Sequence, residues 1–111
     1  MAGLGSLSNK VNEMINDYLK VYGVRRNREY DRLSVRIQIQ ILHDYSGWKN
    51  VGSVSGTIEV KEGRVIKDPN RLVRELYDKA NGYTRNITYY SATAYDVSVG
   101  GYSGVLHARV E

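Results

Sequence analysis

One stretch of the chain, within residues 33–42, alternates apolar and polar side chains from Leu33 to Ile41. A period of two is the pattern of a β-strand with one buried and one solvent-facing side. Another part of the chain must therefore cover the apolar side. The apolar residues are Leu33, Val35, Ile37, Ile39 and Ile41, and the polar ones are Ser34, Arg36, Gln38 and Gln40.

Two segments have the apolar spacing of amphipathic helices and would supply that cover. The first runs from Val11 to Tyr22, with Ser8 as its expected N-cap and Gly23 as its expected stop. The second begins at Asp68-Pro69 and reaches Asn81-Gly82. Asp68 can cap the free backbone amides, and Pro69 suits the first helical position.

Further β segments complete the pattern. We expect a second strand over 53–60, a short third strand at 65–66 after a tight turn at 61–64, and a return strand over 105–110. Residues 43–50 read as a turn-rich linker, and Gly52 and Gly56 predict a bulge or a close approach of another backbone. Residues 83–99 are β-prone throughout, but their apolar phase is mixed, so a bulge shifts the phase or both faces are partly covered.

These elements predict one α+β domain. It contains a mostly antiparallel sheet of four to five strands with two helices packed on one face, in the order α-β-β-(β)-α-β-β. The first seven residues have two glycines and no periodicity, so we expect a flexible arm over 1–7 and a single domain over 8–111. A chain of 111 residues is long enough for one core and too short for two.

Composition narrows the compartment and the chemistry. The chain has no cysteine, which excludes disulfides and thiolate chemistry, and no apolar run near the roughly 20 residues of a membrane span. We therefore expect a cytoplasmic protein that does not enter a membrane. Sixteen basic and twelve acidic side chains give a net charge of +4, which is compatible with a polyanionic partner.

The sequence contains no recognisable catalytic or metal-binding pattern. Its two histidines, His43 and His107, lack metal-ligand spacing, and its carboxylates are scattered. We therefore expect no catalytic residues, no metal and no cofactor, and a protein that is not an enzyme. A hydrolase that uses His43 and Asp44 is the third-ranked alternative, and it requires both residues in a concave pocket with another polar group.

The most basic window of the chain follows the first expected helix, with four arginines between Val24 and Arg32. Arginines contact phosphates and aromatic rings stack on bases, the combination that single-strand binding proteins use. The alternative is a solvated connection balanced by Glu29 and Asp31, with Trp48 closing the edge of the core. We predict binding to single-stranded DNA or RNA through Arg25, Arg26, Arg28, Tyr30, Arg32, Arg36, Tyr45, Trp48 and Lys49.

Ten tyrosines and no phenylalanine suggest a second function. Tyrosine is enriched at protein interfaces because it contributes a large area with little loss of entropy. The chain would then be a homo-oligomer or an assembly subunit with a protein partner, such as a virion component or a factor that blocks a host or competitor protein. A bent strand in a monomer explains the same pattern. The predicted interface residues are Tyr83, Tyr89, Tyr90, Tyr95 and Tyr102.

Overall fold

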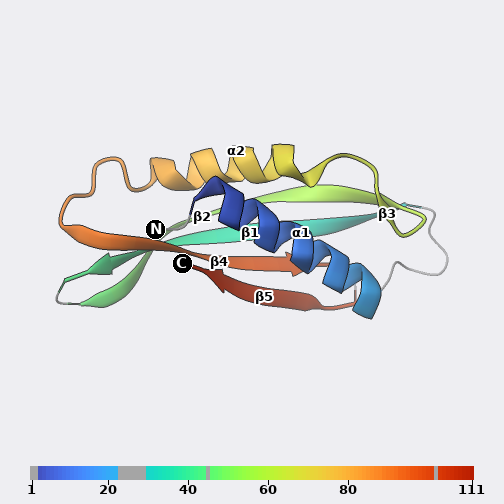
Figure 1. The fold of residues 1–111 in the computed structure, drawn as a ribbon, viewed down its shortest axis with the longest axis horizontal. Helices are drawn as coiled ribbons and strands as arrows, with labels where there is room; N and C mark the ends of the chain where they lie inside the picture. The colour runs from blue at the N-terminus through green and yellow to red at the C-terminus, as the bar shows by residue number, and fades with distance from the viewer. Residues whose placement is uncertain (1–2, 23–29, 45, 102) are drawn as a thin grey trace.

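A five-stranded antiparallel sheet forms one layer of the protein and two helices form the other (Figure 1). The fold is taken from a computed structural model that describes residues 3–22, 30–44, 46–101 and 103–111. The strand order is β3-β2-β1-β4-β5, which confirms the predicted α+β class. The elements are α1 (Leu4–Val21), β1 (Tyr30–His43), β2 (Gly47–Lys61), β3 (Arg64–Val65), α2 (Pro69–Gly82), β4 (Tyr90–Gly100) and β5 (Val105–Val110).

Strand β1 is the centre of the sheet, as its alternation predicts. Its five apolar side chains are at most 2% exposed and point toward the helices. Helix α1 packs over β4 and β5, whereas α2 packs mainly over β2. The helices contribute Leu7, Val11, Met14, Ile15 and Tyr18 from α1, and Val73, Leu76 and Ala80 from α2.

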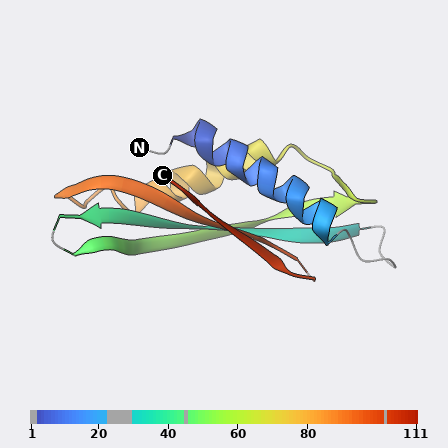
Figure 2. The same ribbon diagram turned by 60° about the horizontal axis from the view of Figure 1, so that its bottom comes forward.

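The long strands make the molecule elongated. The 14 residues of β1 span roughly 46 Å at about 3.3 Å per residue, close to the long dimension of 50 Å. The sheet also twists strongly, so that β4 and β5 cross the direction of β1 and β2 in Figure 2. Both helices lie on one side, and the opposite face of the sheet carries no described helix.

The connection between β1 and β2 is shorter than predicted. The expected linker over 43–50 is wrong, because His43 pairs with Gly47 and the second strand begins there. The register shifts where Ile39 pairs with Gly52 but Gln40 pairs with Asn50, so Val51 forms a bulge. The bulge predicted near Gly52 is therefore present.

Helix α1 begins earlier than predicted. It starts at Leu4 with Gly3 as N-cap, and Leu7 is fully buried, so a flexible arm is wrong for residues 4–7. Ser8 lies inside the helix instead of capping it, and its hydroxyl donates to Oδ1 of Asn70 at the start of α2. Neither described helix is long and apolar enough to span a membrane.

The end of α2 explains why the predicted long strand over 83–99 is wrong. Helix α2 starts as predicted, since Asp68 accepts a hydrogen bond from the backbone N–H of Asn70 at 3.0 Å and Pro69 follows the cap. After Gly82 the backbone continues through consecutive turns, including the bond from the Thr84 N–H to the Asn81 carbonyl. Strand β4 therefore begins only at Tyr90, and a register shift beside His43 changes its phase.

Candidate functional site: the open face of the sheet

We call the side of the sheet away from the helices the open face (Figure 2). The residues that the strand register places on it are mostly polar. Paired residues on neighbouring strands share a face, so the register defines rows across it. One row contains Ser55, Arg36, Ser98 and His107, and the next contains Ser53, Gln38, Asp96 and Arg109. The open face therefore brings together side chains from four strands.

A shallow hollow of 650 Å³ lies on the open face, near the end of β4 and the start of β5. Its lining includes two arginines, Arg32 and Arg36, and one histidine, His107. Asp31 is the one acidic residue among the described residues that line it. The remaining lining consists of the hydroxyl residues Ser34, Thr57 and Ser98, together with Gly100, Gly101 and Val105. Guanidinium and hydroxyl groups around a hollow are donors suited to an anionic group.

Within the described residues, neither Arg32 nor Arg36 of the hollow forms an ion pair with a carboxylate, although Glu59 is the cross-strand neighbour of Arg32 on β2. Arg36 instead donates from Nε to the Ser53 hydroxyl at 2.9 Å. One oxygen of Asp31 accepts the backbone N–H of Arg32 at 2.8 Å. The hollow thus carries more positive than negative charge.

A second hollow continues the first along the open face. It measures 450 Å³ and shares Arg36, Ser98 and His107 with the first hollow. Its far end reaches Asp96 and Arg109. The two hollows together form a trough that follows the strands from Arg32 to Arg109.

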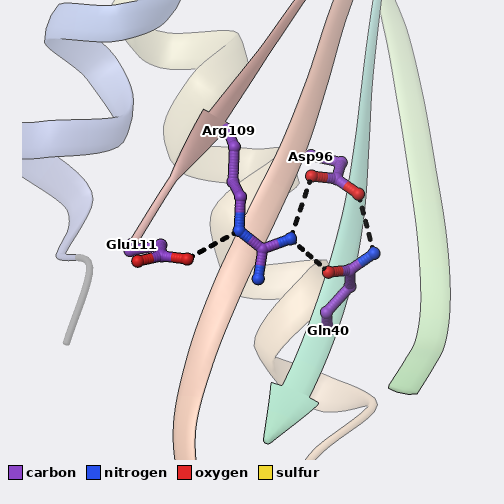
Figure 3. Close-up of polar contacts among 4 residues, drawn as sticks. All are labelled: Gln40, Asp96, Arg109 and Glu111. Carbon is purple, nitrogen blue, oxygen red and sulfur yellow. Dashed lines mark hydrogen bonds and ion pairs between the residues drawn. The ribbon is translucent and has the colours of Figure 1, made fainter. Parts of the chain in front are cut away.

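The end of the trough at Arg109 is a network of four polar side chains (Figure 3). Nη1 of Arg109 lies 2.6 Å from Oε1 of Gln40 and 3.5 Å from Oδ1 of Asp96, and its Nε lies 2.7 Å from Oε1 of Glu111. Gln40 in turn donates to Asp96 at 2.7 Å. The guanidinium carbon lies 4.4 Å from the centre of the Trp48 ring, a stacked cation–π contact.

Among the described residues, the side-chain partner of each histidine is a serine hydroxyl. Nδ1 of His43 lies 3.4 Å from the Ser46 hydroxyl, and Nδ1 of His107 lies 3.0 Å from the Ser98 hydroxyl. Neither imidazole has a hydrogen bond to a carboxylate in the described part of the chain. Residues 3–22, 30–44, 46–101 and 103–111 also contain no group of three potential metal ligands. The expectation that the protein is not an enzyme remains a prediction.

The predicted nucleic-acid residues divide into three sets. Arg32, Arg36 and Trp48 lie on the open face. Lys49 pairs with Ile41 and therefore projects to the opposite face from Trp48, so the structure does not join it to the others. Arg25, Arg26, Arg28, Tyr45 and the side chain of Tyr30 lie outside the described residues.

The tyrosines predicted to form an interface differ in their exposure to solvent. Tyr95 is wrong as an interface residue, because its ring is fully buried beneath α2 and its hydroxyl bonds to Asn81. Tyr83 and Tyr89 are 48% and 84% exposed. Tyr90 is half-buried, and Tyr102 lies outside the described residues.

Sequence reasoning missed Arg109 and Asp96. The alternation of Leu106, Ala108 and Val110 already predicts that Arg109 projects outward. It gives no information about which strand lies beside β5, and the network depends on that order.

A comparison with protein families finds no family model that matches the chain, and comparisons with curated proteins and solved structures find no match.

Proposed function

We propose that the protein binds single-stranded nucleic acid along the open face of its sheet. The observation that carries this proposal is the trough from Arg32 and Arg36, which lack carboxylate partners among the described residues, to Arg109. The Trp48 ring does not line either hollow but lies against the Arg109 guanidinium group. Phosphates would lie against the arginines, and bases would lie against the stacked aromatic end. Single-strand binding proteins combine these two kinds of contact.

The shape of the site favours a single strand over a duplex. The trough is shallow and lies on strands, whereas proteins that read duplex DNA usually insert a helix or a two-stranded ribbon into a groove. Unpaired bases expose their faces, so they can reach a ring on an open sheet. Both RNA and DNA single strands satisfy this requirement.

The arginine-rich connection joins the sheet beside the trough. It leads into β1 at Tyr30, two residues before Arg32. We include Arg25, Arg26 and Arg28 in the proposal as additional phosphate contacts, because their position in the chain directly precedes the hollow. Their contribution would add to that of Arg32 and Arg36.

Fluorescence anisotropy tests the proposal. Labelled single- and double-stranded oligonucleotides are titrated at low and moderate salt with the wild type and with Arg32→Ala/Arg36→Ala. We expect preferential binding of the single strand, weakened by salt and by the double substitution. The matched control is Arg71→Ala/Arg74→Ala on the exposed side of α2, which removes the same charge. Absence of binding at low salt, or equal losses in both variants, would refute the proposal.

A second candidate function is a self-assembling or partner-binding subunit. The observation in its favour is the exposure of Tyr83 and Tyr89 around the connection from α2 to β4. Tyr89 also has a φ of 66°, a left-handed conformation that is unfavourable for a bulky residue by about 1 kcal/mol. An exposed aromatic ring held in this way is typical of a contact residue.

Sedimentation equilibrium tests this second candidate. An oligomer that dissociates in Tyr89→Ser, and further in Tyr83→Ser/Tyr89→Ser, supports it. The single variant removes the more exposed ring, whereas Tyr83 also packs on Gly52 of β2. Tyr22→Ser, at a ring that is 38% exposed at the end of α1, is the control. A monomer at all concentrations excludes self-assembly through these tyrosines.

A further inference from the structure

We infer that Trp48 and Arg109 form a subsite for an unpaired nucleobase, separate from the phosphate-binding hollow at Arg32 and Arg36. The inference rests on the proposed function and divides its site into two parts with different chemistry. One part would supply charge, and the other would supply a flat surface for stacking.

The charge of Arg109 is already compensated. Its guanidinium group meets the carboxylates of both Glu111 and Asp96, at 2.7 Å and 3.5 Å. A phosphate at this position would approach two negative groups and would be repelled. Arg32 and Arg36, which have no such partners among the described residues, are the better phosphate contacts.

The orientation of Arg109 is also fixed. Gln40 accepts from Nη1 at 2.6 Å and is itself held by its bond to Asp96. These contacts come from β1 and β4 (Figure 3). They hold the guanidinium group over the indole of Trp48 on β2. A flexible surface arginine loses entropy when it stacks, whereas this one is held before a ligand arrives.

The stacked pair keeps surface that a base can cover. Trp48 is 39% exposed, and the side chain of Arg109 is 33% exposed. Arg109 lines the far end of the trough from Arg32, and Trp48 lies against Arg109 beyond that end, so one strand can reach the hollow and the ring together. Indole and guanidinium faces both accept stacked bases with little preference among them.

Two probes separate the subsites. One is oligothymidylate of about 12 nucleotides, within the range of known single-strand sites. The other is an abasic oligomer of the same length, which retains the phosphates and lacks the bases. We expect the wild type to bind oligothymidylate about tenfold or more tightly than the abasic oligomer.

Substitutions in the two subsites should change different quantities, the preference for bases and the salt dependence of binding. Trp48→Leu is expected to remove the preference for oligothymidylate while the salt dependence stays unchanged. Arg36→Ala is expected to weaken both probes equally and to lower the slope of log affinity against log salt by about 0.7. Tyr89→Leu, which removes an exposed ring outside the trough, is the matched control and should change neither quantity.

The fluorescence of Trp48 gives a readout that needs no substitution, because it is the single tryptophan of the chain. Oligothymidylate should quench it and the abasic oligomer should not. Equal binding of both probes, or quenching by neither, would overturn the base subsite and the stacking contact at Trp48, while single-strand binding through the phosphate site at Arg32 and Arg36 would stand. If neither probe binds, the proposed function fails and this inference fails with it.

Discussion

Gly52 of β2 lies directly beneath the ring of Tyr83 at the end of α2. A Cβ atom at position 52 would come within 2.8 Å of Cδ1 of that ring, and closer still to Cγ and Cδ2. Gly56 stands in the same relation to Leu72, whose Cδ1 would lie 2.6 Å from an added Cβ. The two glycines therefore let α2 approach the sheet, and the close neighbour predicted at these positions is a side chain, not a backbone.

We expect Gly52→Ala to destabilise the protein by about 1–3 kcal/mol, the usual cost of overpacking. The added methyl group must displace the Tyr83 ring, because the ring carbons nearest to it are close to the backbone of α2. Urea unfolding followed by circular dichroism measures the loss.

The control for this prediction is a double-mutant cycle. In Tyr83→Ala the ring is absent, so Gly52→Ala should cost much less there. Gly5→Ala, at a helical position with open space around it, should be neutral or stabilising. An equal cost of Gly52→Ala with and without Tyr83 would mean that strain comes from the strand itself.

The hydroxyl of Tyr95 contributes a second, measurable part of stability. It lies 2.9 Å from Nδ2 and 3.1 Å from Oδ1 of Asn81, inside the layer between α2 and the sheet. Tyr95→Phe leaves the Asn81 amide without this partner, so we expect a loss of about 1–2 kcal/mol at pH 7. Tyr89→Phe, at an 84% exposed ring, should have no effect in the same unfolding measurement.

The same residue predicts a pH dependence. Burial raises the pKa of Tyr95 to about 12, while the Asn81 hydrogen bond acts in the opposite direction. Because the unfolded chain releases this proton near pH 10, the free energy of unfolding should fall as the pH rises from 10 to about 12. The decline should be shallower in Tyr95→Phe, by an amount on the order of 2 kcal/mol over this interval. Parallel curves for the two proteins would contradict the raised pKa.

The parts of the fold that could be predicted are those that local spacing determines. The alternation over 33–42 identifies every buried residue of β1's apolar side, and Asp68-Pro69 locates the start of α2. Both signals depend on residues close together in the chain, where strand period and capping chemistry act. The open polar face around Arg36 follows from the same alternation.

The remaining parts depend on strand order and on one bulge. Trp48 reaches Arg109 only because β2, β1, β4 and β5 are neighbours in that order, which no local pattern specifies. The bulge at Val51 shifts the phase of β2, so the residues before it do not continue the alternation of the residues after it. Lys49 points away from Trp48 because neighbouring residues of a strand project to opposite faces. Tyr95 was misassigned to an interface because the mixed phase of its strand does not indicate which face α2 covers.

The cap of α2 supplies a fourth prediction. The carboxylate of Asp68 accepts the Asn70 N–H at 3.0 Å and lies at the positive end of the helix. Asp68→Ala should therefore lower the free energy of unfolding by about 1 kcal/mol. Asp78→Ala, at an exposed position within the same helix, removes the same charge and should be neutral or stabilising. Equal losses in both variants would assign the effect to net charge instead of capping.

Because the carboxylates of Asp96 and Glu111 neutralise the charge of Arg109, a substitution that removes one of them should strengthen the binding of nucleic acid. Asp96→Asn keeps a side chain of the same shape whose oxygen can still accept the Gln40 amide, but it removes one of the two negative charges beside Arg109. Arg109 would then attract phosphates, so affinity for single strands should rise at low salt and the salt slope should steepen by up to about 0.7. Asp78→Asn, which changes the net charge equally on α2, is the control. Anisotropy titrations across a range of salt concentrations measure both quantities. If Asp96→Asn and Asp78→Asn give the same small increase, the gain reflects overall charge and the ligand does not approach Arg109.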